Sequence, residues 1–357
     1  MTGKMSLSDF EVLSVYEDSY VENESFIVDP STIICLPVDI KPELSYWIFV
    51  GYLLIFLIAI PGNLMVAVVI GTNYRSLVPS DIYLFHLALA DVFFALTIPF
   101  WGISAMQGWV FGNAMCKLIS LIQEINFYSS ILFLVCISID RYLAIVWAVK
   151  TKKKRMPFFS WLLCIIVWLL GVILSLPVLH NHAFKPLNLT KTVCYEEYNP
   201  QTSDHWRFSI RMLRHVLGFL LPLTIMLICY GITVSRLLQT RSFGKQKAMK
   251  VIVSVVSGFL FCWMPYHIVV MLDTAMRAGL FPHTCEKRYS IDLALLATQS
   301  LGLLHSCINP FLYAFVGEKF KQNFLKFLVK TGLTKRNVQW KSSRSSSQNS
   351  DITSTMM

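Results

Sequence analysis

Residues 136–146 read Cys-Ile-Ser-Ile-Asp-Arg-Tyr-Leu-Ala-Ile-Val and end a long apolar run with an adjacent acid and base, Asp140 and Arg141. Charges at the mouth of a hydrophobic helix are costly in lipid, so they usually face the interior of a helix bundle or its polar rim. There Arg141 can stay paired with Asp140 or turn to another partner. The alternative is an interfacial anchor, because long basic side chains often snorkel at helix ends.

Apolar residues elsewhere fall into similar long runs. The 357 residues are 55% hydrophobic and 15% charged, with a mean hydropathy of +0.57. Each run reaches or exceeds the roughly 20 residues that a helix needs to cross a bilayer. The sequence therefore predicts an all-α membrane protein with a seven-transmembrane helix bundle. The predicted spans cover residues 47–71, 82–105, 114–146, 158–179, 208–238, 251–274 and 291–315.

Basic residues predict the orientation of the chain. Lysine and arginine gather between spans 3 and 4, between spans 5 and 6, and after span 7, and cytoplasmic loops carry such an excess. The N-terminus is therefore predicted outside the plasma membrane and the C-terminus in the cytosol. Two glycosylation sequons, at Asn23 and Asn188, fall on the predicted outer face. The first 26 residues show no hydrophobic stretch typical of a cleaved signal peptide.

The nine cysteines divide by predicted location. Cysteines inside the spans should pack as small hydrophobic residues; these are Cys136, Cys164, Cys229, Cys262 and Cys307. Cys35, Cys116, Cys194 and Cys285 fall on the predicted outer side, where disulfides persist. Of the three pairings that four cysteines allow, we favour Cys116–Cys194 with Cys35–Cys285, although the sequence alone leaves all three open.

Three flanking regions are predicted around the bundle, which we place at residues 47–316. Residues 1–46 form an acidic arm with nine acidic residues against two lysines, suited to attract a basic extracellular protein or, alternatively, merely solvated. Tyr16 and Tyr20 lie among acids, a setting suited to tyrosine sulfation. Residues 317–330 place phenylalanines on one helix face and lysines on the other, as in a helix lying on membrane lipid. Residues 331–357 are predicted to be a disordered Ser/Thr-rich tail that phosphorylation would make acidic.

Polar residues within the spans predict an internal site and a switch. Asp91 lies mid-span, where a carboxylate needs a cation or hydrogen-bond donors. Either a structural polar cluster or a sodium cage of Asp91, Asn126, Ser130 and Asn309 would satisfy it, and no other cofactor is expected. Prolines 222, 265 and 310 permit kinks in spans 5 to 7. The predicted activation switch comprises Asp140, Arg141, Tyr142, Tyr230, Trp263, Pro265, Asn309, Pro310 and Tyr313.

Charges of both signs gather at the predicted outer end of the bundle. Arg207 and Arg211 are one helical turn apart and share a face, with Arg214 following. Asp273, Glu286, Lys287 and Arg288 flank the connection between spans 6 and 7. A mixed-sign pocket would suit a peptide or small protein, whereas a solvated cluster at helix ends is the alternative. The sequence shows no nucleophile elbow, phosphate loop or metal-ligand spacing, so no enzyme activity and no nucleic-acid partner are predicted.

Short motifs across residues 45–330 resemble those of rhodopsin-like G-protein-coupled receptors and occur in that family's order. They are Gly62-Asn63, Leu-Ala-Leu-Ala-Asp91, Asp140-Arg141-Tyr142, Trp168, Cys-Trp-Met-Pro265 and Asn309-Pro310-x-x-Tyr313. Thr97-Ile-Pro99-Phe-Trp101, His305-Ser-Cys-Ile-Asn-Pro and the four outer cysteines are similar to chemokine receptors. Cys194-Tyr-Glu, Trp206-Arg207, Asp273-Thr-Ala-Met-Arg277 and Thr-Cys285-Glu-Lys-Arg288 are similar to the CXC group that binds interleukin-8-type ligands.

The resemblance implies a CXC chemokine receptor that couples to an inhibitory heterotrimeric G protein, mobilises calcium and directs neutrophil chemotaxis. Receptor kinases and arrestin would desensitise it through the tail. The acidic arm would capture the chemokine core, while the ligand's Glu-Leu-Arg stretch enters the outer pocket. The implied ligand contacts are Tyr16, Tyr20, Trp101, Glu124, Arg207, Arg211, Tyr266, Asp273, Glu286, Arg288 and Gln299. Gln299 and Gln123 depart from the glutamate and lysine common among relatives, which leaves the ligand open.

Other functions fit less well. A chemokine-scavenging receptor without G-protein signalling would be favoured by loss of the Asp140-Arg141-Tyr142 triplet, which is present. A receptor for another peptide stays open. A retinal protein needs a lysine in span 7, and residues 291–315 contain none. A transporter would show inverted repeats, which we do not find, and an amine receptor would carry a carboxylate where Gln123 stands.

Overall fold

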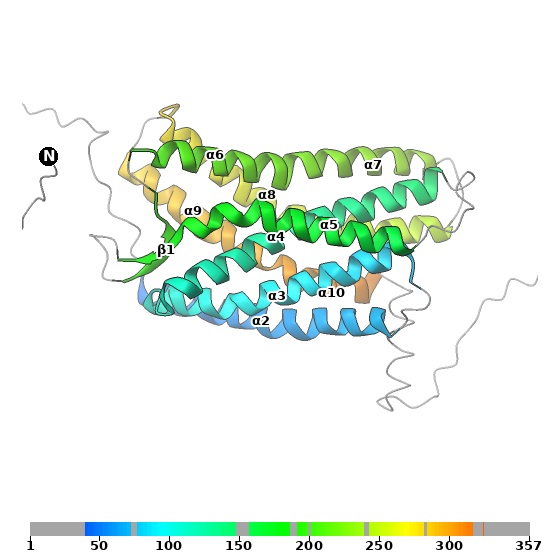
Figure 1. Ribbon diagram of the computed structural model, residues 1–357, viewed down its shortest axis with the longest axis horizontal. Helices are drawn as coiled ribbons and strands as arrows, with labels where there is room; N and C mark the ends of the chain where they lie inside the picture. Colours follow the sequence, from blue (N-terminus) through cyan, green and yellow to red (C-terminus); the bar gives the residue numbers. More distant parts are fainter. Residues whose placement is uncertain are drawn as a thin grey trace, which may run out of the picture.

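The computed structural model describes residues 40–72, 77–147, 157–185, 191–198, 201–238, 243–281, 284–316 and Phe324. Within these ranges it contains seven helical stretches long and apolar enough to cross a membrane, which confirms the predicted fold (Figure 1). The α-helices are α2 (Pro42–Gly71), α3 (Pro79–Gln107), α4 (Gly112–Val146), α5 (Pro157–Ser175), α6 (Ser203–His215), α7 (Leu221–Leu238), α8 (Phe243–Arg277), α9 (Cys285–Leu303) and α10 (His305–Val316).

Several helices begin earlier than hydropathy alone predicts. The first begins at Pro42 and not at residue 47, and Pro79 and Pro157 likewise open α3 and α5. Proline suits the first turn because its ring fixes a helical φ and its missing N–H has no partner there in any helix. The first turns of α2 and α3 are polar, so a hydropathy window excludes them although the backbone is already helical, whereas α5 begins only one residue before its predicted span.

Two of the spans are composite. The fifth consists of α6, the π-helical turn η5 (Val216–Leu220) and α7. Gly218 in that turn lies against α4 so closely that an added Cβ would be 2.5 Å from Cε1 of Phe127. The seventh span consists of α9 and α10, separated at Leu304. Neither interruption was predicted from the sequence.

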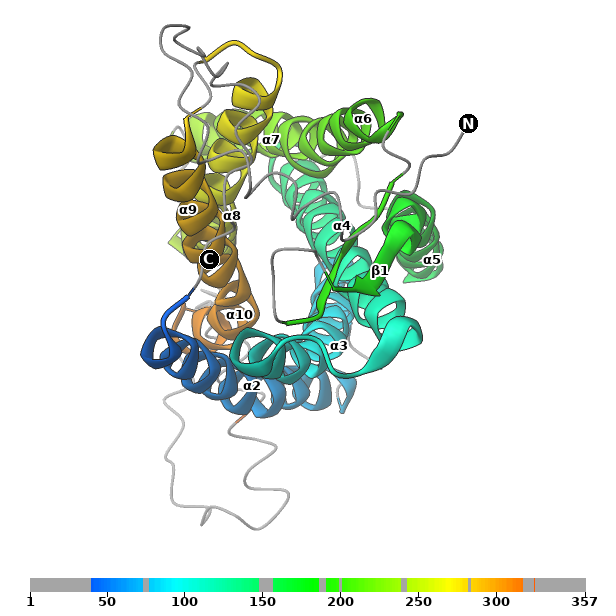
Figure 2. The ribbon, with the colours of Figure 1, turned by 90° about the vertical axis from the view of Figure 1, so that its left-hand side faces the viewer.

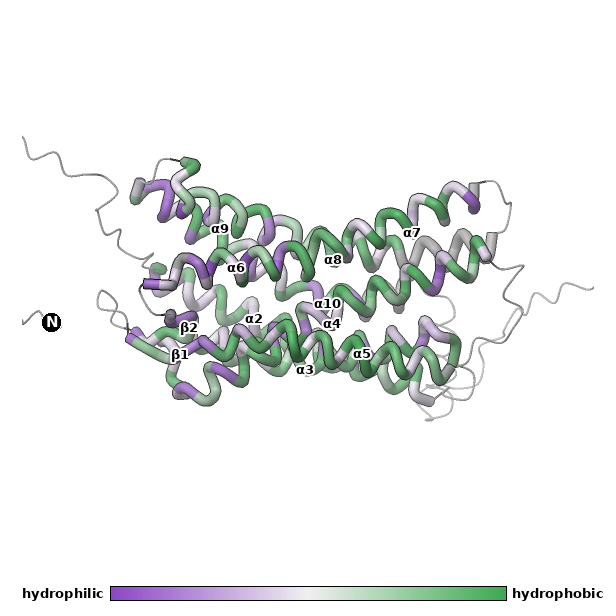
Figure 3. The backbone as a smooth tube through the Cα atoms, turned by 45° about the horizontal axis from the view of Figure 1, so that its top comes forward, coloured by the Kyte–Doolittle hydropathy of each residue, from purple (hydrophilic) through white to green (hydrophobic). Residues whose placement is uncertain are grey.

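Viewed along their length, the helices form a ring in which α5 lies outermost, against α4 (Figure 2). Helix α4 is the central element because it contacts α3, α5, α7 and α8. Large side chains such as Phe94, Phe133 and Met226 are fully buried between the helices. Apolar side chains on the outer surface, including Ile165 and Leu169, stay exposed, as a protein surrounded by lipid tails requires. Apolar residues predominate along the helices, and polar residues gather toward the ends (Figure 3).

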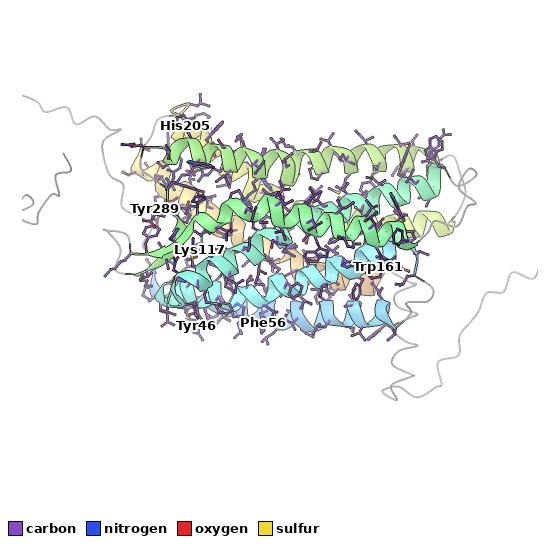
Figure 4. All side chains as sticks on the ribbon, viewed as in Figure 1. Tyr46, Phe56, Lys117, Trp161, His205 and Tyr289 are labelled. Carbon is purple, nitrogen blue, oxygen red and sulfur yellow. A yellow bond between two sulfur atoms is a disulfide. The ribbon has the colours of Figure 1, made fainter. Side chains whose placement is uncertain are left out.

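One end of the bundle carries a two-stranded antiparallel sheet, and we call it the hairpin end. After the 3₁₀ turn η4 (Leu176–His180), strand β1 (Asn181–Phe184) pairs with β2 (Val193–Glu196), with Ala183 opposite Cys194. The Cys116–Cys194 disulfide ties β2 to the start of α4 and confirms that predicted pairing. Figure 4 shows the side chains of Lys117, His205 and Tyr289 toward this end, and Trp161 toward the opposite one.

The structure confirms further cysteine predictions and leaves others untested. Cys136, Cys164, Cys229, Cys262 and Cys307 are all free thiols. Cys285 is disulfide-bonded, but Cys35 lies outside the described residues, so their pairing stays a prediction. Tyr16, Tyr20, Asn23, Asn188, the tail, the side chain of Tyr313 and nearly all of the predicted interfacial helix at residues 317–330 also lie outside the described part.

Candidate functional site

A buried carboxylate at the hairpin end connects three arginines. Asp273 on α8 is fully buried and accepts a hydrogen bond from Arg211 Nη1 on α6 at 2.6 Å. Arg277 Nε, one turn along α8, donates to it at 3.1 Å, and Arg288 Nη1 on α9 donates to its other oxygen. The helical ends of spans 5, 6 and 7 therefore meet at one ion-pair network.

The network carries more positive than negative charge. Arg207, one turn before Arg211, has a buried Nε that finds no hydrogen-bond partner among the described residues. Asp292 neutralises part of the positive charge because its carboxylate accepts two hydrogen bonds from Arg288. We call Arg207, Arg211, Arg277 and Arg288 the arginine cluster. Its four cations face Asp273, Asp292 and Glu196.

Tyr195 on β2 reaches this cluster from the hairpin. Although 46% of the Tyr195 surface is exposed, protein surrounds its phenol oxygen. This loss of water raises the pKa of Tyr195, and the nearby Glu196 raises it further, while three cluster arginines act in the opposite direction. The phenol therefore stays protonated at neutral pH and can donate a hydrogen bond to an anion.

A second ion pair lies on the same face of α6. Arg214 donates from Nε and Nη2 to the two carboxylate oxygens of Glu124 on α4, at 2.8 and 2.9 Å. Such a bidentate pair fixes both side chains, which are 20% and 13% exposed. Glu124 was predicted as a ligand contact without a protein partner, and Arg214 was placed among the outer charges but not among the ligand contacts. The spacing of residues 207, 211 and 214 along one helix face is the signal that points to Arg214.

Aromatic rings lead from these ion pairs to the middle of the bundle. Phe127, one turn from Glu124, contacts Trp263 with ring centroids 5.1 Å apart. Trp263 in turn contacts His305 at 5.4 Å. Gly302 on α9 approaches this indole closely, because an added Cβ there would lie 3.2 Å from the Trp263 ring. Movement of the indole toward Gly302 would therefore require α9 to shift.

The chain of rings ends beside the predicted sodium cage. Asp91 is fully buried and accepts hydrogen bonds from Asn309 Nδ2 at 2.7 Å and Asn126 Nδ2 at 3.4 Å, with His305 Nε2 3.7 Å away. Asn126 also donates to Ser130 Oγ at 3.1 Å, while its own Oδ1 is buried without a partner among the described residues. One carboxylate beside neutral oxygens fits Na⁺, which prefers oxygen ligands. No group of three His, Cys, Asp or Glu that could hold a metal occurs in the described ranges.

At the end opposite the hairpin, Arg141 contacts a residue that was not among its predicted partners. Its Nη2 donates to Ser80 Oγ at the start of α3, while its Nε is buried without a partner among the described residues. Tyr230 on α7 lies within electrostatic range of Arg141, but its hydroxyl is hydrogen-bonded to Ser138 Oγ at 2.7 Å. Asp140 is 9% exposed. Arg141 is therefore hydrogen-bonded to α3, and the hydroxyl of the nearby Tyr230 is already hydrogen-bonded to Ser138.

The remaining predicted contacts are spread around the hairpin end. Trp101 packs against Trp109 with centroids 5.4 Å apart, and its indole N–H is buried without a partner among the described residues. Tyr266 is half-buried beside Trp263, whereas Glu286 and Gln299 are exposed. The structure thus brings Arg211, Asp273 and Arg288 together and leaves Glu286 and Gln299 outside their ion-pair network.

Known proteins share much of this sequence. Residues 62–313 match the family described as seven-transmembrane receptor (rhodopsin family). The chain is 46% identical over 290 residues to C-X-C chemokine receptor type 1 from Oryctolagus cuniculus, covering 81% of each chain. It is 46% identical over 317 residues to C-X-C chemokine receptor type 2 from Mus musculus, covering 88% of this chain and 87% of that one. Type 2 from Macaca mulatta is 42% identical over 347 residues, or 96% and 97% of the two chains.

Proposed function

We propose that this chain, which belongs to the rhodopsin family of seven-transmembrane receptors and within it to the CXC chemokine receptors, is a plasma-membrane receptor for an interleukin-8-type CXC chemokine. The observation that carries the ligand proposal is the arginine cluster, where four cations face three carboxylates and Arg207 Nε lacks a partner among the described residues. This family consists of receptors and not of enzymes.

Ligand binding then proceeds by exchange of ion pairs. A ligand glutamate placed among Arg207, Arg211 and Arg288 gains charge-assisted hydrogen bonds from donors that are already positioned. As these arginines turn to the ligand, Asp273 loses part of its coordination and becomes available to a ligand arginine. Affinity comes from this exchange only to the extent that the new pairs exceed the old ones. The acidic arm contributes a separate, electrostatic attraction for the basic chemokine core.

The signal passes through a packed path with a switch at each end. Rearrangement at Glu124 and Asp273 shifts α4 and α8, and with them Phe127 and Trp263. At the far end, Arg141 leaves Ser80 and turns toward Tyr230, opening the site that an inhibitory G protein occupies. We place this end in the cytosol and the hairpin end outside, and we assign calcium mobilisation, neutrophil chemotaxis, and desensitisation by receptor kinases and arrestin to the same receptor.

We also propose that a sodium ion regulates this step. Asp91, the free Oδ1 of Asn126 and the Ser130 hydroxyl would hold the ion, while Asn309 orients the carboxylate. When bound, the ion supplies the positive charge that compensates a carboxylate deep in the bundle. The conformation that keeps these oxygens together binds sodium more tightly than a conformation that separates them. Sodium therefore stabilises the first conformation by the difference between the two binding free energies.

Cells expressing the chain should lower cyclic AMP and release calcium in response to an interleukin-8-type chemokine. Silence across a panel of CXC chemokines, at normal surface expression, would reject the proposed function. Arg211→Ala should impair activation strongly, whereas Lys287→Ala, which removes an exposed cation near the same end, should not. Arg141→Ala should keep chemokine binding and lose G-protein signalling, so preserved signalling contradicts the role of Arg141.

A further inference from the structure

Two histidines face one another between spans 5 and 6, one turn from the arginine cluster. The Nδ1 atoms of His215, the last residue of α6, and His267 on α8 lie 3.3 Å apart. We propose that these two nitrogens form a binding site for zinc or a similar divalent transition-metal ion. Nothing in the proposed chemokine-receptor function requires such a site, so the two proposals stand or fall separately.

The separation of the two nitrogens matches the geometry of zinc. With Zn–N bonds of about 2.0–2.1 Å and a tetrahedral angle, two imidazole ligands lie about 3.3–3.4 Å apart. A hydrogen bond between the two rings is the alternative, and at 3.3 Å it would be a long one. The site therefore needs little movement to accept the ion, because the first two ligands already have the required spacing.

Neighbouring side chains bury His267 and leave His215 partly exposed. His267 is 2% exposed and stacks on Phe219 with centroids 4.2 Å apart and ring planes 22° apart. His215 is half-buried, and the adjacent side chains of Arg214 and Glu124 are 20% and 13% exposed. Water can therefore reach the site and complete the coordination of the metal.

Nearby charges permit a cation here. Arg214 lies close enough to His267 to influence it electrostatically, but it is neutralised by its bidentate pair with Glu124. Metal on Nδ1 leaves the ring proton on Nε2, and Nε2 of His267 has no hydrogen-bond partner among the described residues. With two protein ligands and this unpaired N–H, we expect weaker affinity than that of structural zinc sites, which have four protein ligands. A bound ion would join α6 to α8 beside Phe127, whose ring centroid lies 5.8 Å from that of His267.

The test is thermal unfolding of the purified full-length receptor in detergent, without chemokine, in Zn²⁺ or in Mg²⁺. Zn²⁺ should raise the unfolding temperature of the unsubstituted receptor, and Mg²⁺ should not, because a ligand that binds only the folded state stabilises it. His215→Gln and His267→Asn should each weaken the apparent zinc affinity by more than about tenfold. His215→Cys retains a metal ligand and should retain the rise.

The matched control is His180→Gln, which removes an exposed histidine at the hairpin end. It should leave the effect of Zn²⁺ unchanged, and loss of the effect in this variant would assign zinc to the hairpin and overturn the proposal. Absence of a rise in the unsubstituted receptor, or its persistence in His215→Gln, overturns it equally. His215 is half-buried, so its substitution tests the site even if His267→Asn does not fold.

Discussion

The ion-pair network around Asp273 leads to a quantitative prediction about stability. In Asp273→Asn the side chain keeps its shape and one oxygen, but the charge that strengthens its hydrogen bonds is gone. Charge-assisted hydrogen bonds contribute about 1.5–3 kcal/mol and neutral ones about 0.5–1.5 kcal/mol, so each well-buried bond loses about 1 kcal/mol. Arg211 and Arg288, 12% and 19% exposed, supply two such bonds.

Arg277 adds little to this sum. Its side chain is 37% exposed, and ion pairs open to water contribute only about 0–1 kcal/mol. The expected loss is therefore about 2 kcal/mol, equivalent to a fall of roughly 4–8 °C in unfolding temperature. A thiol-reactive fluorophore can follow unfolding of the detergent-solubilised receptor, because four of the five free cysteines in the described ranges are buried.

Asp292→Asn provides the control for this experiment. Asp292 also pairs with Arg288, but it does so within one helix and is 25% exposed. The same substitution there should lower the free energy of unfolding by less than about 0.5 kcal/mol, because exposed ion pairs one turn apart contribute no more than that. Equal losses from the two substitutions would refute the argument that burial and the shared position of Asp273 make its charge important.

Three further predictions concern the interior of the bundle. Gly218→Ala should destabilise the receptor by about 1–3 kcal/mol through overpacking, whereas Gly231→Ala, whose Cβ would meet no atom within 4 Å, should not; equal unfolding temperatures would contradict the close contact. Replacing choline with sodium should change agonist affinity in membranes, and Asp91→Asn should abolish this dependence; a variant that keeps it places the ion elsewhere. In a double-mutant cycle by thermal unfolding, Glu124→Gln and Arg214→Gln should show a coupling of about 1–3 kcal/mol, and additive losses would mean that the pair does not form.

The spans could be predicted from the sequence because a bilayer imposes a simple length requirement on apolar helices. Their details depend on contacts that hydropathy does not include. The early start at Pro42 lies in a polar turn, and the π turn at Val216–Leu220 reflects the packing of Gly218 against α4. Strands β1 and β2 contain four residues each, too short for an alternating pattern to stand out from a loop.

The sequence indicates which charged residues lie in the site, but it does not indicate which of them form ion pairs. Opposite charges at Arg211 and Asp273 were visible in the sequence, as was the position of both near helix ends. Which cation each acid receives depends on the rotation and tilt of three helices, so the pair of Glu124 with Arg214 emerged only from the structure. Ser80 as the partner of Arg141 could not be anticipated, since a single serine at a helix start is common and carries no specific signal.

The π turn in the fifth span affects the directions in which the side chains of α6 and α7 point. Each residue of an α-helix turns the chain by about 100°, and a π turn accommodates one residue more than an α turn. The additional residue at 216–220 therefore changes the direction in which Arg211 and Arg214 point relative to Tyr230, compared with an uninterrupted α-helix. The side chains that face the outer pocket and those that face the opposite end of the bundle are thus positioned separately within one span.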